Sequence, residues 1–150
     1  MIHLGEITEE NWLEAARLRL AEGQLAFVAD PVGILARAYV YRDCRARVWT
    51  VEEDGRMVGL AMVREFEDEP LGYELQQFLI DCREQGRGIG TQALTLVLDR
   101  LRREGRWPTV EVCVKKADVP ALRVYEKAGF VDSGYVDPEV PDALNLVCRL

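Results

Sequence analysis

The chain has 150 residues, of which 49% are hydrophobic and 30% are charged, and its formal net charge is -7 at pH 7. This length and composition are typical of one globular domain, residues 1–150, with a sizeable hydrophobic core. The negative charge argues against nucleic acid as a partner, since nucleic acid is bound through its phosphates, and no apolar run is long enough to span a membrane.

The chain shows no targeting segment and no metal-binding pattern. Residues 1–6 lack a basic region followed by an apolar one, so we recognise no signal peptide and expect a cytoplasmic protein. The four cysteines are scattered without a C-x-x-C pair, and His3 is the only histidine. A zinc site needs clustered Cys and His ligands, so no metal site is predicted, and the thiols are expected to be reduced.

The N-terminal third reads as a strand followed by two helices. Residues 2–7 alternate between apolar and polar, which indicates a strand. Thr8 is a candidate N-cap for a helix that carries apolar residues as far as Leu20. Asp30, followed by a proline, predicts the start of a second helix that runs to about Tyr41. We expect these helices and their connection to cover one end of a sheet.

A hairpin follows, formed by residues 47–53 and 56–63. The turn between them, Asp54-Gly55, favours a type I′ turn, and Gly59 in the second strand indicates a bend or close packing. The next segment, residues 65–70, is rich in carboxylates. It has two interpretations, a solvated surface turn or a feature that attracts an amine cation toward a site.

Residues 73–103 read as a strand, a glycine-rich turn and an amphipathic helix. Glycines recur on alternate positions from Gly86 to Gly90, and apolar residues recur at helical spacing from Leu94 to Leu101. Glycine lets backbone N–H groups approach a ligand closely, and a helix N-terminus directs unpaired N–H groups and the positive end of its dipole to one point. Such a point binds phosphate or another anion.

Two familiar phosphate-binding motifs do not fit this turn, and a turn without a ligand is the plain alternative. A P-loop needs Gly-Lys-Ser/Thr, which the chain lacks, and a dinucleotide-binding G-x-G-x-x-G has a different glycine spacing.

After Gly105 and Pro108 end the helix, residues 109–115 alternate as a strand. Asp118 is expected to cap a helix that runs through Ala128. Strands are predicted at residues 130–136 and 143–148.

Two segments carry a resemblance to a known family. Gln85-x-x-Gly88-x-Gly90 resembles the [RQ]-x-x-G-x-[GA] motif of the GNAT superfamily, the acetyl-CoA-dependent N-acetyltransferases. Residues 118–130 resemble the family segment N-x-x-A-x-x-x-Y-E-K-x-G-F, with Asp118 in place of the usual Asn. The resemblance covers the C-terminal half in detail, and the N-terminal half only has a compatible pattern.

The resemblance implies an α/β (α+β) fold. In this GNAT fold, a mixed, mostly antiparallel sheet of about six to seven strands is flanked by about four helices, and a splayed strand pair forms the acetyl-CoA cleft. It also implies direct transfer of the acetyl group from acetyl-CoA, the co-substrate, to a primary amine in a ternary complex. Members are often dimers, so a homodimer is an expected assembly.

The resemblance further implies which residues hold the co-substrate. The turn would bind its diphosphate, with Arg83 and Arg87 near the phosphates, and the preceding strand would pair with the pantetheine arm and supply an oxyanion donor. The cofactor-binding residues implied are Phe78, Leu79, Ile80, Gln85, Gly86, Arg87, Gly88, Ile89, Gly90, Thr91 and Asp118.

Two residues are implied to be catalytic. Tyr125 matches the family tyrosine that faces the thioester sulfur and acts as a general acid. Glu74 precedes Gln85 at the spacing of a base glutamate in some members. Strand alternation predicts one shared face for the even-numbered residues from Glu74 to Ile80, where burial would raise the pKa of a glutamate. A surface role for Glu74, and an ordered water as the proton acceptor, remain alternatives.

The acceptor is expected to be a small, cationic amine. Residues 73–81 and 24–28 resemble bacterial spermine/spermidine acetyltransferases, which suggests a polyamine. Those enzymes carry a carboxylate where this chain has Gln76, so either Glu74 takes the base role or the substrate differs. The alternatives are another amine, namely an aminoglycoside, an amino acid, a protein N-terminus or a lysine, or a non-catalytic acyl-CoA-binding module.

Overall fold

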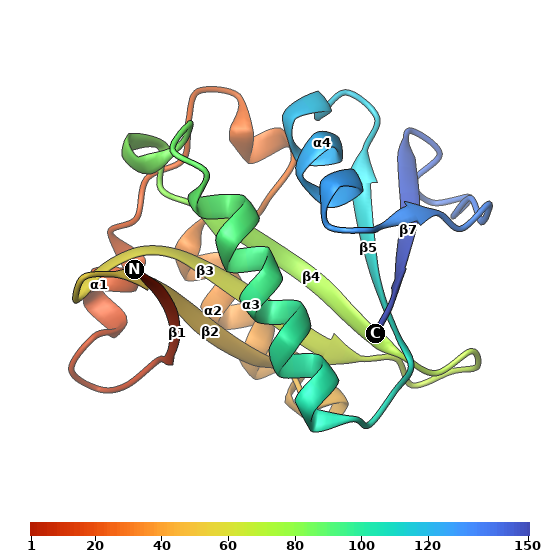
Figure 1. Ribbon diagram of the computed structural model, residues 1–150, viewed down its shortest axis with the longest axis horizontal. Coiled ribbons are helices and arrows are strands. Elements are labelled where there is room, and N and C mark those ends of the chain that lie inside the picture. The colour runs from red at the N-terminus through yellow and green to blue at the C-terminus, as the bar shows by residue number, and fades with distance from the viewer.

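The computed structural model describes residues 1–150 as a seven-stranded mixed sheet with helices on both faces (Figure 1). The strands are β1 (Ile2–Glu6), β2 (Arg47–Glu53), β3 (Arg56–Glu65), β4 (Tyr73–Ile80), β5 (Thr109–Lys115), β6 (Val131–Asp132) and β7 (Ala143–Arg149). The helices are α1 (Trp12–Ala16), α2 (Pro31–Val40), α3 (Ile89–Glu104) and α4 (Val119–Lys127), with short 3-10 turns η1 (Gln24–Ala26), η2 (Arg42–Cys44) and η3 (Cys82–Glu84). The predicted fold class is confirmed.

The strand order is β1-β2-β3-β4-β5-β7-β6, and only the β4–β5 pair is parallel. That pair is short, because it joins Tyr73 to Val110 and Glu74 to Glu111 and then ends. Beyond this rung the two strands are no longer paired and their backbones diverge (Figure 1), and we call the region between the diverging backbones the V-shaped opening. The predicted splayed strand pair is therefore confirmed.

A β-bulge interrupts the β3–β4 ladder at Gln76. Val63 pairs with Leu75 and Met62 pairs with Gln77, so Gln76 is an extra residue in β4. The extra residue reverses the alternation of side chains along the strand.

The bulge places Glu74 and the end of β4 on different faces. Phe78 and Ile80 pack on the α3 side of the sheet, whereas Glu74 bonds to Arg64 beside Tyr41, on the α2 side. The prediction that the even-numbered residues from Glu74 to Ile80 share one face is therefore wrong, because it assumed an uninterrupted strand.

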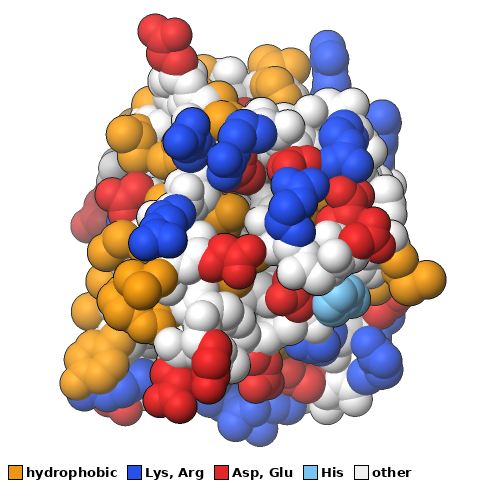
Figure 2. Space-filling model, turned by 90° about the vertical axis from the view of Figure 1, so that its left-hand side faces the viewer, with side chains coloured by type: hydrophobic (Ala, Val, Ile, Leu, Met, Phe, Trp, Pro, Cys, Tyr) orange, Lys and Arg blue, Asp and Glu red, His pale blue; other side chains and the backbone are white.

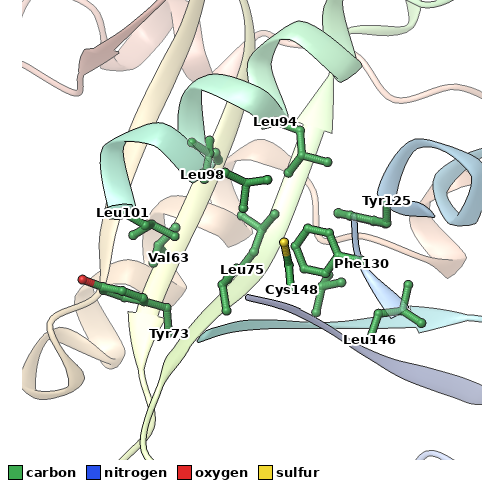
Figure 3. Packing of buried hydrophobic residues seen from close by; sticks show 14 of the residues in the cluster. Val63, Tyr73, Leu75, Leu94, Leu98, Leu101, Tyr125, Phe130, Leu146 and Cys148 are labelled. Carbon is green, nitrogen blue, oxygen red and sulfur yellow. The ribbon is translucent and has the colours of Figure 1, made fainter. Parts of the chain in front are cut away.

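The main core lies between α3, α4 and the sheet. Apolar residues of α3 pack on β4 and β5, and Tyr125 and Phe130 close the end of the cluster next to α4 (Figure 3). A second cluster lies on the opposite face, where Ala15 of α1 and Ile34 of α2 cover Leu60 and Leu79. No helix in the fold is both long and apolar enough to cross a membrane.

The hairpin forms as predicted. Asp54 and Gly55 both have positive φ angles, 50° and 80°, as a type I′ turn requires. A Cβ atom on Gly59 would lie 2.3 Å from the carbonyl oxygen of Leu79, so only glycine lets β3 and β4 approach here. The close packing expected at Gly59 is confirmed.

The first helix differs from its prediction. Helix α1 starts at Trp12 and its N-cap is Asn11, not Thr8. The Asn11 side chain accepts the N–H of Thr8 at 2.7 Å and donates to the carbonyl of Glu6 at 2.9 Å. The Thr8 hydroxyl accepts the N–H of Glu10 at 3.3 Å, within this local turn. The helix that follows is short, and Leu20 lies outside it.

Two C-terminal and loop predictions are also corrected. Of residues 130–136, only Val131–Asp132 form a strand, because Gly134 has a φ angle of 81° and donates its N–H to Asp132. Glu65 does not belong to a solvated loop. It ends β3, is 6% exposed, and binds Arg45, Arg106 and the indole N–H of Trp107.

Candidate active site

The turn before α3 presents a row of unpaired backbone donors. No backbone N–H from Gln85 to Thr91 donates a hydrogen bond within the protein, and Gln92 is the first that does. Gly86 and Gly88 make this possible with φ angles of 82° and 77°. The N-cap, Gly88, has no side chain that could satisfy the helix end, so these backbone donors are left free for a ligand that accepts hydrogen bonds, such as an anion.

The arginines around the turn are occupied by carboxylates. Arg87 donates to Glu84 at 2.5 Å and to Glu53 at 3.0 Å, and Arg83 donates to Asp81 at 2.7 Å. The left-hand side of the molecule accordingly shows basic side chains interleaved with acidic ones (Figure 2). The side chain of Arg87 therefore helps to fix the turn, and its backbone N–H is its free donor.

Asp81 anchors the end of β4. It is 1% exposed and accepts the backbone N–H of Arg19 at 2.9 Å as well as the side chain of Arg83. These donors outweigh the cost of burial and lower the pKa of Asp81 to about 2. The adjacent Cys82 N–H donates to the Arg19 carbonyl at 2.8 Å. The backbone at Arg19, in the segment before η1, is thus hydrogen-bonded to the two residues that follow β4 and precede the glycine turn.

The open edge of β4 faces the V-shaped opening. Asp81 donates its N–H to Val58 of β3, so by alternation Leu79 also directs its backbone to β3, while Phe78 and Ile80 direct theirs to the opening. Gln85 Nε2 occupies the Ile80 carbonyl at 3.0 Å. The free groups at the edge therefore include the Phe78 N–H and carbonyl and the Ile80 N–H.

Leu79, a predicted cofactor-binding residue, is placed differently. Its backbone belongs to the β3–β4 ladder opposite Leu60, and its side chain is fully buried in the cluster under α1 and α2. It can shape the strand but presents no polar group to the opening.

Tyr125 reaches from α4 into the main core (Figure 3). Its ring packs edge-on against Phe130, with 5.3 Å between the centroids, and its hydroxyl makes no hydrogen bond within the protein. Burial, helped by the charge of Asp118, raises the pKa of Tyr125 above its ordinary value. The phenol therefore keeps its proton at neutral pH and is free to donate it.

Asp118, a predicted cofactor-binding residue, is the N-cap of α4. Its carboxylate accepts the N–H of Ala121 at 3.4 Å. An aspartate can cap a helix as well as the asparagine of the family pattern, so the departure in sequence keeps the local structure.

Glu74, the predicted base, lies in an ion pair. Arg64 Nε donates to its carboxylate at 2.6 Å, and the Arg64 guanidinium stacks 4.5 Å from the centre of the Tyr41 ring. Glu74 is therefore not a free carboxylate but the partner of Arg64.

Two polar groups near the opening were not predicted. The Oε1 atom of Gln76, at the bulge, is buried without a hydrogen-bond partner. Glu111 stands next to Glu74 across the last rung of the β4–β5 pair. The alternation of residues 109–115 could have placed Glu111 on the polar face of its strand, but its neighbour depends on a register that the sequence does not reveal.

The fold and this site define an acetyltransferase. The model of the Acetyltransferase (GNAT) family matches residues 9–130, so the chain belongs to that family. Among curated relatives, spermine/spermidine N(1)-acetyltransferase of Bacillus subtilis is 25% identical over 142 residues, which cover 91% of each chain. Mycothiol acetyltransferase of Thermomonospora curvata is 35% identical over 116 residues, which are 67% of this chain and 38% of the relative.

Solved structures share the fold at low identity. Spermidine N-acetyltransferase from Vibrio cholerae, in complex with CoA and spermine, has a TM-score of 0.78 and 17% identity, and the match covers 99% of this chain and 95% of that one. An aminoglycoside acetyltransferase in complex with coenzyme A has a TM-score of 0.80 at 17% identity, with the same coverage. The structural likeness to the aminoglycoside enzyme is thus as strong as that to the polyamine enzyme.

Proposed function

We propose that the protein acetylates a primary amine of a small polycation of the polyamine class, with acetyl-CoA as the donor. The observation that carries the donor side is the row of unpaired N–H groups from Gln85 to Thr91 at the start of α3. It lies at the end of β4 whose edge is open, so one extended ligand can use both features (Figure 1). The diphosphate of acetyl-CoA would bind the turn, and its pantetheine arm would pair with Phe78 and Ile80.

The chemistry we assign to the chain follows from these positions. A backbone N–H at the open edge of β4, such as that of Phe78, stabilises the oxyanion that forms when an amine attacks the thioester. The carbon–sulfur bond then breaks, and Tyr125 donates its proton to the thiolate. The Tyr125 hydroxyl has no hydrogen-bond partner within the protein, and this supports the role. Glu74 contributes negative charge on the acceptor side, and the proton acceptor is either this carboxylate or another group beside it.

The acceptor class rests on charge and on relatives. A carboxylate at the base of the opening favours a cationic amine, and two of the relatives above act on spermine or spermidine. The neutral Gln76 departs from the polyamine pattern, and the aminoglycoside enzyme is an equally similar structure. An aminoglycoside is therefore the second candidate acceptor.

A panel assay tests the proposal. Purified protein is incubated with acetyl-CoA and, separately, with spermidine, spermine, kanamycin, single amino acids, and peptides with a free N-terminus or lysine, while release of the CoA thiol is followed. We expect the highest kcat/KM with spermidine or spermine. Turnover with kanamycin alone would favour the second candidate, and CoA binding without turnover of any amine would indicate a non-catalytic module.

A further inference from the structure

Glu111 occupies the point where β4 and β5 separate. Its neighbours on β5, Val110 and Val112, are buried in the main core, so the Glu111 side chain lies on the opposite face of the sheet. Glu111 pairs with Glu74 in the last rung of the β4–β5 ladder. Two carboxylates from neighbouring strands therefore stand side by side at the base of the V-shaped opening.

Only one of these two carboxylates, Glu74, has a cation as its partner. Arg64 donates to Glu74 and is held on its other side by the ring of Tyr41. Glu111 makes no ion pair, and the lysine on the same face of β5, Lys115, is bonded to Asp142 at 2.9 Å. The negative charge of Glu111 is left without a partner, and an external cation would supply one.

The other charged and titratable groups on this face do not change that balance. The thiol of Cys113 lies next along the strand, with Asp137 and Asp142 beyond it, and Arg149 of β7 lies opposite Thr109. Burial and the charge of Glu74 together raise the pKa of Glu111. Both causes favour the protonated form, which is the direction that suits a proton acceptor.

The carboxylate is also reachable from solvent. Helices α1 and α2 pack on β2 and β3, so they leave the same face of β5 uncovered, and Cys113 beside Glu111 is exposed. Tyr125 belongs to the core cluster of Val112 on the other face. An amine held by Glu111 and a thiolate that meets Tyr125 would therefore approach the opening from opposite faces of β5.

We propose that Glu111 binds the ammonium group of the acceptor and takes its proton before the thioester is attacked. This inference rests on the proposed function and assigns the proton acceptor that was left open there. Glu74, fixed by Arg64, then serves as a positioning residue that keeps the local field negative.

An N–H bond of the ammonium breaks, its proton moves to the Glu111 carboxylate, and the freed electron pair on nitrogen attacks the carbonyl carbon. The carbon–sulfur bond breaks, and the thiolate is protonated through Tyr125, which recovers a proton from the amide nitrogen. Glu111 is partly exposed and returns its proton to water, so an amide, the CoA thiol and a released proton are formed.

The test compares Glu111→Gln with the wild-type protein and with Glu126→Gln, a change at an exposed position of α4. Kinetics are measured with acetyl-CoA and the best acceptor of the panel across pH. We expect kcat/KM for the amine to fall by ~10²–10³ in Glu111→Gln, while the KM for acetyl-CoA is unchanged. Wild-type kcat/KM should rise with pH as Glu111 ionises, and the variant should lack this rise.

Four results would overturn the inference. One is an unchanged pH profile and kcat/KM in Glu111→Gln, and another is loss of the pH-dependent rise in Glu74→Gln alone. If the wild-type protein acetylates no amine, the proposed function fails, and Glu111 is judged by calorimetric titration of spermidine into the CoA-saturated protein. Binding at least tenfold weaker in Glu111→Gln supports the inference, whereas equal binding, or no binding by the wild-type protein, overturns it.

Discussion

Tyr125 is held in place by apolar packing and not by hydrogen bonds. Its ring lies against Phe130 in the core, and its hydroxyl has no protein partner. A packed ring with a free hydroxyl is positioned without being consumed by the fold, as a proton donor must be. The family motif identified this tyrosine in the sequence, and the structure adds that burial raises the pKa of its phenol further above neutral pH.

Removal of the Tyr125 hydroxyl alone should lower the catalytic rate while leaving the stability of the fold nearly unchanged. In Tyr125→Phe the ring keeps its packing, so the free energy of unfolding should change by less than about 1 kcal/mol, while kcat should fall by ~10²–10⁴. Urea unfolding and steady-state kinetics measure the two effects. Tyr135→Phe, on an exposed loop, is the matched control and should leave kcat unchanged. An undiminished kcat in Tyr125→Phe would exclude the acid role.

The raised pKa of Tyr125 predicts a high-pH signature. Burial favours the neutral phenol, so its ionisation in the folded protein occurs above the ordinary tyrosine value of about 10. The resulting contribution to stability is present below about pH 10 and is lost as pH rises through the folded pKa. The ultraviolet difference titration between wild-type protein and Tyr125→Phe reports this phenol. Its ionisation at or below pH 10 would contradict the prediction.

Asp81 predicts a change at the acid end. Its pKa is about 2 in the folded protein, and about 3.9 is expected when unfolded, so its contribution is present above about pH 4 and is lost as pH falls toward about 2. Asp81→Asn should be less stable by ~1–3 kcal/mol at neutral pH, and its stability should fall less steeply with acid. Urea unfolding from neutral to acid pH measures this, with Asp43→Asn as the exposed control. Parallel pH curves for Asp81→Asn and the wild-type protein would contradict it.

At the scale of elements, the sequence was sufficient to predict those turns and helix caps whose structure depends only on residues close together in the chain. The Asp54-Gly55 turn, the Asp30 cap and the glycine turn at residues 86–90 all follow from backbone conformations that few residues can adopt. The predicted start of α1 was wrong because Thr8 and Asn11 are both residue types that favour N-caps, and their side chains both bond to nearby backbone groups.

Features that depend on pairing between distant strands could not be predicted. The bulge at Gln76 arises because Leu75 and Gln77 both pair with β3, and their partners there are consecutive residues, so Gln76 is left without a partner. The bulge changes which side chains of β4 lie on the same face as Glu74, and no sequence pattern within β4 predicts it. The partnership of Glu74 with Glu111 likewise comes from the β4–β5 register. The acceptor side of the site was therefore less predictable than the donor side.

Close contact between β3 and β4 predicts an unusual sensitivity at Gly59. In Gly59→Ala the new methyl group would meet the Leu79 carbonyl at 2.3 Å, and relief requires the paired strands β3 and β4 to move apart. We expect a loss of ~1–3 kcal/mol in the free energy of unfolding. Gly55→Ala is the matched control, because it has open space and incurs only the cost of its positive φ. Equal effects in urea unfolding would contradict the contact argument.

At the scale of the molecule, the sheet consists of two parts that meet at a short seam. Strands β1 to β4 form one part and β5, β7 and β6 form the other, and the β4–β5 pairs that join them end at Glu74 and Glu111. The helices α3 and α4, one from each part, contact each other above the seam. A ligand between the diverging strands would touch both parts, so binding should stabilise the whole domain by mass action.

Titration of CoA into the isotope-labelled protein, followed through its backbone amide resonances, tests the donor site directly. We predict that the largest shifts fall on the amides from Gln85 to Thr91 and on Phe78 and Ile80 at the open edge of β4. Smaller shifts should appear around Tyr125. If CoA binds while the amides from Gln85 to Thr91 stay unmoved, or if CoA does not bind, the turn is only structural and the proposed acetyl transfer at this cleft is wrong.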